Sequence, residues 1–113
     1  MMNPTIGEAR IKLPERISRG DLITVNSIVS HPMDTGFFRD ADGDPIPAYY
    51  IERVLVTYGG DEVARFEWTS GISRDPVVSF TLRAEKEAPL TMVWTDNKGA
   101  TFKQSVNIGF VSA

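Results

Sequence analysis

The sequence predicts an all-β protein, an immunoglobulin-like antiparallel β-sandwich of about seven strands without a disulfide. Apolar residues alternate with polar ones in short runs along the chain, and the runs recur every 8–12 residues or so. No segment shows the 3.6-residue apolar period of a helix over three turns. The chain contains no cysteine, so the Cys–Trp–Cys pattern of antibody domains is absent.

The first four expected strands are 9–13, 22–29, 49–58 and 63–68. Residues 9–13 alternate up to Pro14, and 22–29 is rich in β-branched side chains, which favour strands. Gly59–Gly60 between the third and fourth runs is typical of a two-residue hairpin. Residues 33–48 contain glycines and prolines that break regular structure, so an irregular segment is expected there.

The remaining expected strands are 77–84, 90–95 and 100–110, after a second irregular stretch at 69–76. Residues 96–99 read Asp-Asn-Lys-Gly, which is typical of a turn. Pairing these strands in two packed sheets is expected to bury four large side chains between the sheets: Phe80, Leu82, Met92 and Trp94.

Length and composition restrict the function classes. With 113 residues the chain is expected to form a single domain, 1–113. The net charge is −3 with scattered Lys and Arg, which disfavours a nucleic-acid partner, and no apolar run is long enough to cross a membrane. Without cysteine there is no thiolate metal site and no cysteine nucleophile. The first residues show no secretory signal.

Candidate chemistry is sparse. His31 is the only histidine, so a histidine-based zinc site is not expected; it either caps a strand end before Pro32 or contacts a partner. Asp40–Asp44 looks like a calcium loop, but the positions of the EF-hand glycine and glutamate hold Pro45 and Ile51, so a polar turn is expected. We therefore expect no catalytic residue, no metal site and no cofactor.

The segment from His31 to Pro47 is chemically distinct. Its net charge of −3 equals that of the whole chain, and it contains the adjacent pair Phe37–Phe38. Neighbouring residues of a strand face opposite sides, so one of the two rings is expected to be exposed or on a loop. One interpretation is a solvated loop with one ring tucked beneath it. The other is a docking loop, because aromatic side chains and Arg are enriched at the centres of interfaces.

Three motifs in and around this segment resemble the SoxZ family of sulfur-oxidation proteins. They are 30–36 (Ser-His-Pro-Met-Asp-Thr-Gly), 39–43 (Arg-Asp-Ala-Asp-Gly) and Ile46–Pro47, and the segments 9–14 and 94–99 extend the resemblance over the chain. The resemblance implies a small immunoglobulin-like sandwich. It also implies a non-catalytic subunit that pairs with SoxY, whose C-terminal cysteine arm covalently carries sulfur intermediates during thiosulfate oxidation while other enzymes of the pathway act on them.

The resemblance further implies a periplasmic location, reached by co-export with the SoxY-like partner. Together with the docking-loop interpretation it leads us to expect seven partner-interface residues: His31, Met33, Asp34, Phe37, Phe38, Arg39 and Asp40. The chain departs from the family at Phe37–Phe38 and at Ala48-Tyr49-Tyr50, where more basic or polar residues are expected. Both departures add aromatic surface near the loop.

Two other functions compete with the carrier subunit. A standalone ligand-binding module, for carbohydrate for example, would use Trp68 and Trp94 as a platform, although both lie in alternating apolar runs that favour core packing. A hydrolase would need a triad or a carboxylate pair in a cleft, and the sequence contains neither pattern.

Overall fold

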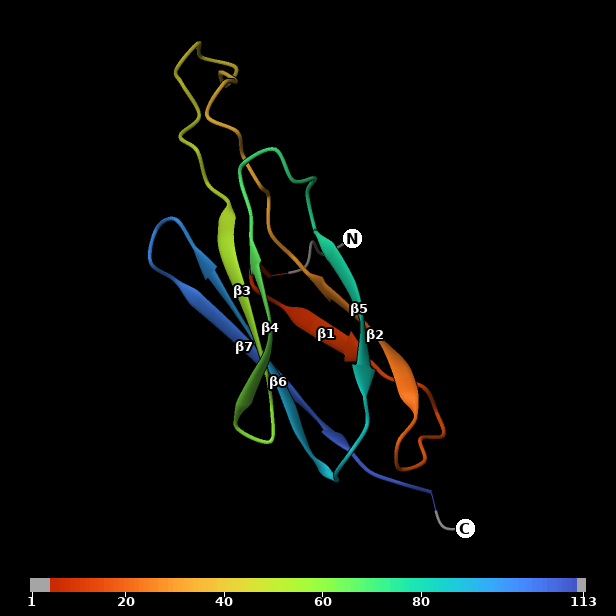
Figure 1. Cartoon of the computed structure of the whole chain (residues 1–113). Coiled ribbons are helices and arrows are strands. Elements are labelled where there is room, and N and C mark those ends of the chain that lie inside the picture. The colour runs from red at the N-terminus through yellow and green to blue at the C-terminus, as the bar shows by residue number, and fades with distance from the viewer. Residues whose placement is uncertain (1–4, 112–113) are drawn as a thin grey trace.

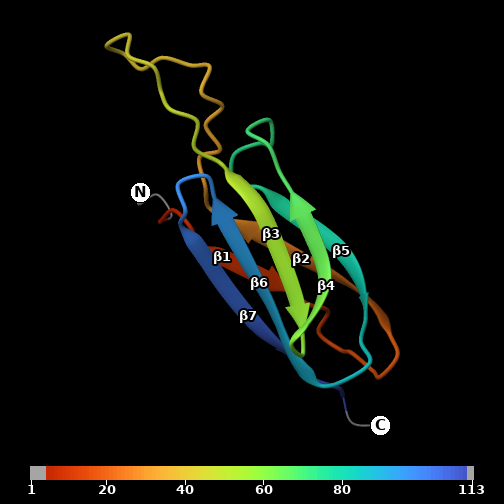
Figure 2. The same ribbon diagram turned by 60° about the vertical axis from the view of Figure 1, so that its left-hand side comes forward.

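The computed structural model describes residues 5–111 and confirms the all-β sandwich. Two antiparallel sheets pack face to face, and Figure 2 shows the larger one in front of the smaller one. No helix occurs in this range, so none could span a membrane. The seven strands are β1 (Ala9–Lys12), β2 (Leu22–Val29), β3 (Ile51–Tyr58), β4 (Asp61–Glu67), β5 (Val77–Arg83), β6 (Ala88–Asp96) and β7 (Thr101–Ile108).

The smaller sheet has the strand order β1-β2-β5, and the larger one has the order β4-β3-β6-β7. The expected hairpin at Gly59–Gly60 joins β3 to β4, and both glycines have positive φ values that a side chain would strain. A Cβ on Gly59 would also lie 2.7 Å from the Lys86 side chain. Glycine at this position therefore permits the tight turn.

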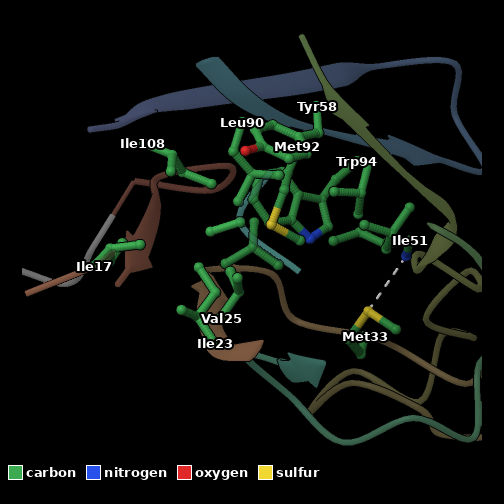
Figure 3. Close-up of a cluster of buried hydrophobic side chains, with 14 residues drawn as sticks. Ile17, Ile23, Val25, Met33, Ile51, Tyr58, Leu90, Met92, Trp94 and Ile108 are labelled. Atoms are coloured by element: carbon green, nitrogen blue, oxygen red, sulfur yellow. Dashed lines mark hydrogen bonds between the residues drawn. The ribbon is translucent and has the colours of Figure 1, made fainter. Parts of the chain in front are cut away.

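The core lies between the two sheets (Figure 3). Met92 and Trp94 of β6 are fully buried, as the alternation predicted. Phe80 and Leu82 are only half-buried, which corrects the expectation for them. They lie on the edge strand β5, at the open side of the sandwich, where the Phe80 ring meets the Phe66 ring of β4 at 6.1 Å.

The two long connections lie at one end of the sandwich, together with the β6–β7 turn (Figures 1 and 2). The connection between β2 and β3 projects farthest from the sheets. Strand β3 begins at Ile51, two residues later than predicted. Tyr49 and Tyr50 are instead bonded to the projecting segment and to the β6–β7 turn, and these bonds build the site described next.

Candidate functional site

The segment from residue 31 to residue 47, called the docking loop here, is a narrow ribbon that folds back on itself. Asp34 and Tyr49 exchange two backbone hydrogen bonds of 2.7 and 3.0 Å, and these close its base. Farther out, the Ile46 N–H donates to the Phe38 carbonyl at 2.9 Å. Because backbone bonds cross the ribbon at two levels, it has a defined direction away from the sheets.

The tip of the loop is a polar turn held by one carboxylate. Oδ1 of Asp40 accepts the backbone N–H groups of Asp42 and Asp44 at 2.9 and 3.0 Å. The Arg39 guanidinium donates to the carbonyl of Gly43 at 2.8 Å. This bonding confirms the interpretation of 40–44 as a turn in which an aspartate satisfies its own backbone.

The two adjacent phenylalanines are the most exposed large apolar side chains in the described part of the chain. Phe37 is 87% exposed and Phe38 is 67% exposed. Neither ring is tucked beneath the loop, contrary to the solvated-loop interpretation. Two exposed aromatic rings on successive residues of a braced ribbon provide apolar surface of the kind that anchors protein interfaces.

His31 lies under the base of the loop and is only 1% exposed. Its Nδ1 accepts the backbone N–H of Met33 at 3.3 Å, so its Nε2 carries the proton in the neutral ring. Nε2 lies 3.5 Å from Oδ2 of Asp96 at the end of β6. Burial lowers the pKa of His31 from its ordinary value of 6.5, and the nearby Asp96 carboxylate opposes this shift only in part.

Asp75 bonds the backbone of His31 from the opposite side. Its carboxylate accepts the His31 N–H, and its own N–H donates to the His31 carbonyl, each at 2.9 Å. Asp75 has a φ of 51°, an unusual backbone conformation for a residue with a side chain. The segment 69–76 is thereby fixed to the loop base, and the two connections form one unit.

The β6–β7 turn holds the other side of the loop base. Oδ1 of Asp96 accepts the N–H groups of Lys98 and Ala100, which orders the turn. Asn97 then accepts the N–H of Tyr50 at 2.9 Å and donates to the carbonyl of Ala48 at 2.8 Å. The returning strand of the docking loop is therefore bonded to the turn through one side chain.

A tilted aromatic contact extends this anchor. The Tyr49 ring lies 4.4 Å from the His31 ring, and Lys98 Nζ lies 3.9 Å from the Tyr49 ring centroid, within cation–π distance. Burial and the Asp96 carboxylate both raise the pKa of the Tyr49 hydroxyl. The phenol is therefore neutral at any ordinary pH, and the cation against its ring is Lys98.

Met33 links the loop to the hydrophobic core. It has a φ of 54°, and its sulfur accepts the N–H of Ile51 at 3.3 Å (Figure 3). Beside it an open cleft of about 400 Å³ separates the docking loop from segment 69–76. Pro32, Thr35, Phe38, Ile72 and Arg74 contribute to its lining.

The predicted interface residues therefore divide into two groups. Phe37, Phe38, Arg39 and Asp40 lie on the surface of the ribbon, whereas His31 and Met33 are buried and hold its base. Asp34 is half-buried at the closing bridge. Their assignment to a partner interface stays a prediction.

Sequence reasoning missed Asp75, Asp96, Asn97 and Lys98 as parts of this site. The last three belong to the turn motif at 94–99 that contributed to the family resemblance, but nothing in a linear sequence shows which loop a turn will contact. No cluster of three or more possible metal-ligating side chains of His, Cys, Asp or Glu occurs within residues 5–111.

Solved structures establish the class of fold. Superoxide reductase (neelaredoxin) from Ignicoccus hospitalis is 19% identical with a TM-score of 0.67, covering 91% of this chain and 80% of its own. The sulfur carrier protein SoxY from Chlorobium limicola f thiosulfatophilum is 19% identical with a TM-score of 0.63, covering 92% of this chain and 79% of its own. A variant of superoxide reductase from Archaeoglobus fulgidus is 20% identical with a TM-score of 0.63, covering 91% of this chain and 88% of its own. These likenesses define a shared β-sandwich fold.

The family follows from the sequence. Residues 11–107 match the family model described as sulphur oxidation protein SoxZ, and this range includes the whole docking loop and the β6–β7 turn. The chain belongs to the SoxZ family. It matches no curated protein sequence.

Proposed function

We propose that this protein is the non-catalytic subunit of a SoxYZ-type carrier complex. In this complex it pairs with a SoxY-like subunit whose C-terminal cysteine arm carries the sulfur intermediates. The SoxZ family match over residues 11–107 carries the proposal. The sequence contains no cysteine, so in this arrangement the partner supplies the thiol that binds sulfur. The complex would act in the periplasm, which this chain would reach by co-export with its partner.

The docking loop supplies part of the proposed interface. Its rings are exposed, while its base is fixed to segment 69–76 and to the β6–β7 turn through hydrogen bonds around His31 and Asn97. A braced loop presents an aromatic contact with little loss of conformational entropy on binding. The surface residues Phe37, Phe38, Arg39 and Asp40 would touch the partner, and His31, Met33 and Asp34 would hold the loop in position.

The carbohydrate-binding alternative receives no support from the geometry. Trp94 is fully buried in the core, and Trp68 is half-buried and packed against the same core. The two indoles therefore do not form an exposed platform on which a sugar could stack.

The proposal is tested by co-expressing the chain with the SoxY-like subunit of the same organism and measuring complex formation. We expect a stable complex, with sulfur adducts detected by mass spectrometry on the partner's cysteine. Phe37→Ala and Phe38→Ala should each weaken binding by about 2 kcal/mol or more, as at buried aromatic anchors. Asp42→Ala at the rim should change it by less than about 1 kcal/mol. A chain that purifies alone when co-expressed with SoxY would overturn the proposal.

A further inference from the structure

The outer face of the β1-β2-β5 sheet has an unusual charge distribution. Its outward positions, within the described residues, hold three cations (Arg10, Lys12 and Arg83) and no carboxylate. None of the three forms an ion pair with another described residue; the Arg83 guanidinium donates to the carbonyl of Gly20. Glu8 borders this face just before β1. The carboxylate of Asp75, also at the border, accepts the His31 backbone N–H.

The opposite face, on the larger sheet, is built differently. Arg53 lies 3.7 Å from Glu67 across β3 and β4, and Arg65 pairs with Glu62 at 2.7 Å. A hydrogen bond to Glu62 raises the pKa of Arg65. Most charged side chains on that face form ion pairs with one another, whereas the cations of the smaller sheet form none with the described residues.

Apolar side chains accompany these cations on the smaller sheet. Leu22 is 62% exposed, Ile28 is 43% exposed and Val77 is 63% exposed. Ile28 lies directly opposite Val77 in the β2–β5 ladder and opposite Arg10 in the β1–β2 ladder. Two surface hollows, of about 270 and 260 Å³, lie against Arg10 and Ile28. The face therefore has an exposed apolar pair, Ile28 and Val77, with Arg10 beside it and hollows against it, while Leu22 lies apart at the other end of β2.

Strand β5 adds an unprotected edge to this surface. Edge strands normally carry charges or proline that prevent pairing with another chain. β4 has four charged residues in seven and the four-residue β1 has two, whereas β7 has one lysine within the strand. β5 reads VVSFTLR, with one terminal arginine and no other charge or proline, and it pairs only with β2.

We propose that this face, with the β5 edge, is the surface that docks the SoxY-like subunit, through an apolar patch bordered by carboxylates on that subunit. This inference rests on the proposed function and adds which surface of the chain makes the main contact with the SoxY-like subunit. The charge of the face argues against a second copy as the occupant, because two copies of this chain facing each other here would oppose cations with cations. The hollow at Glu8 and Asp75 adjoins the base of the docking loop, so the face and the loop form one continuous surface.

The size of the surface agrees with this role. A standard interface buries about 800 Å² on each partner, more than one narrow loop can supply. A sheet face with an exposed apolar pair, Ile28 and Val77, at the end next to the docking loop would supply the remainder. A partner that meets both surfaces would contact Phe37 and Phe38 on the docking loop, and the partner's acidic patch would contact the sheet.

The test compares matched variants on the two outer faces by surface plasmon resonance with the immobilised SoxY-like subunit. Lys12→Glu should weaken binding about tenfold or more, while Lys103→Glu, the same charge change on the exposed outer face of β7, should stay within about twofold. Val77→Thr should weaken binding about fivefold and Val63→Thr on β4 should not, because only Val77 would lie in a desolvated contact. Circular dichroism and melting temperature check that each variant folds.

Salt provides a second measurement. Wild-type binding should weaken between about 50 and 300 mM salt, and Arg10→Glu/Lys12→Glu should flatten this dependence. If the wild type binds SoxY and all variants bind as well as it does, the assigned surface is wrong and the proposed function stands. If the wild type does not bind SoxY at all, both fail. Wild-type self-association that Lys12→Glu abolishes would identify a second copy as the occupant and overturn the inference.

Discussion

Nε2 of His31 and Oδ2 of Asp96 face each other at 3.5 Å, and neither atom has a hydrogen-bond partner within the described residues. The distance is too long for a well-formed hydrogen bond but close enough for strong attraction between a ring N–H and a carboxylate. Because Nδ1 is already occupied by the Met33 N–H, the ring has one tautomer that suits both neighbours. This pair connects the base of the docking loop to the end of β6.

Two substitutions at Asp96 should separate its two tasks. Asp96→Asn keeps an oxygen for the Lys98 and Ala100 N–H groups but removes the charge beside His31, so it should cost about 1 kcal/mol of unfolding free energy. Asp96→Ala removes both the acceptor oxygen and the charge, and it should lower the free energy of unfolding by about 3 kcal/mol. Urea denaturation measures the difference. Equal losses for the two variants would show that the charge beside His31 is the part that matters.

Stability should decrease as the pH falls below about 6.5. Burial holds the pKa of folded His31 below 6.5, so the unfolded chain binds more protons in the window beneath that value, and protonation favours unfolding. Because His31 is the only histidine, His31→Asn should flatten stability between pH 6.5 and about pH 5, where carboxylates begin to contribute. Denaturation curves for both proteins across this range test it; parallel pH profiles would contradict it.

Asn97→Ala should loosen the docking loop without unfolding the sandwich. The variant loses one bond from the Tyr50 N–H and one to the Ala48 carbonyl, which together should cost about 1–2 kcal/mol. Hydrogen exchange should quicken at Tyr50 and in residues 34–47 and stay unchanged in β2 and β5. Asn107→Ala, at an exposed position of β7, is the matched control and should leave the loop as it is.

Tyr58→Phe should destabilise the far end of the sandwich. The buried Tyr58 hydroxyl donates to the Lys86 carbonyl and accepts the Lys86 N–H, which fixes the turn before β6. Removing the hydroxyl leaves the Lys86 carbonyl and N–H without that partner and should lower the free energy of unfolding by about 1–2 kcal/mol. Thermal and urea unfolding measure the loss. Tyr50→Phe is the control, since the Tyr50 side chain forms no hydrogen bond within residues 5–111, and an equal loss there would contradict the explanation.

The alternation of side chains predicted the sandwich because burial on one face is a local property of each strand. Met92 and Trp94 are examples, since their positions in β6 are readable from their neighbours alone. Phe80 and Leu82 were predicted to be as buried, but their burial depends on β5 lying at an open edge, which is a property of the whole sheet order.

Part of the candidate site could likewise be predicted from the local sequence, and part could not. The exposed rings of Phe37 and Phe38 follow from two adjacent aromatic residues in a segment rich in glycine and proline. The burial of His31 does not follow from the local sequence, because it results from the Tyr49 ring packing against it at a tilt and from Asp96, 65 residues later in the chain, lying beside its Nε2. Long-range contacts of this kind are set by topology, which alternation does not encode.

The brace at the base of the docking loop also bears on how fast the protein would associate with the proposed SoxY-like partner. A loop that had to order itself on contact would add a slow step after collision, and its association rate would depend on that ordering. Here Asn97, Asp75 and the Asp34–Tyr49 bridge fix the ribbon beforehand. Association should therefore proceed as a single rigid-body step, with kinetics that fit one exponential and an on-rate governed by charge.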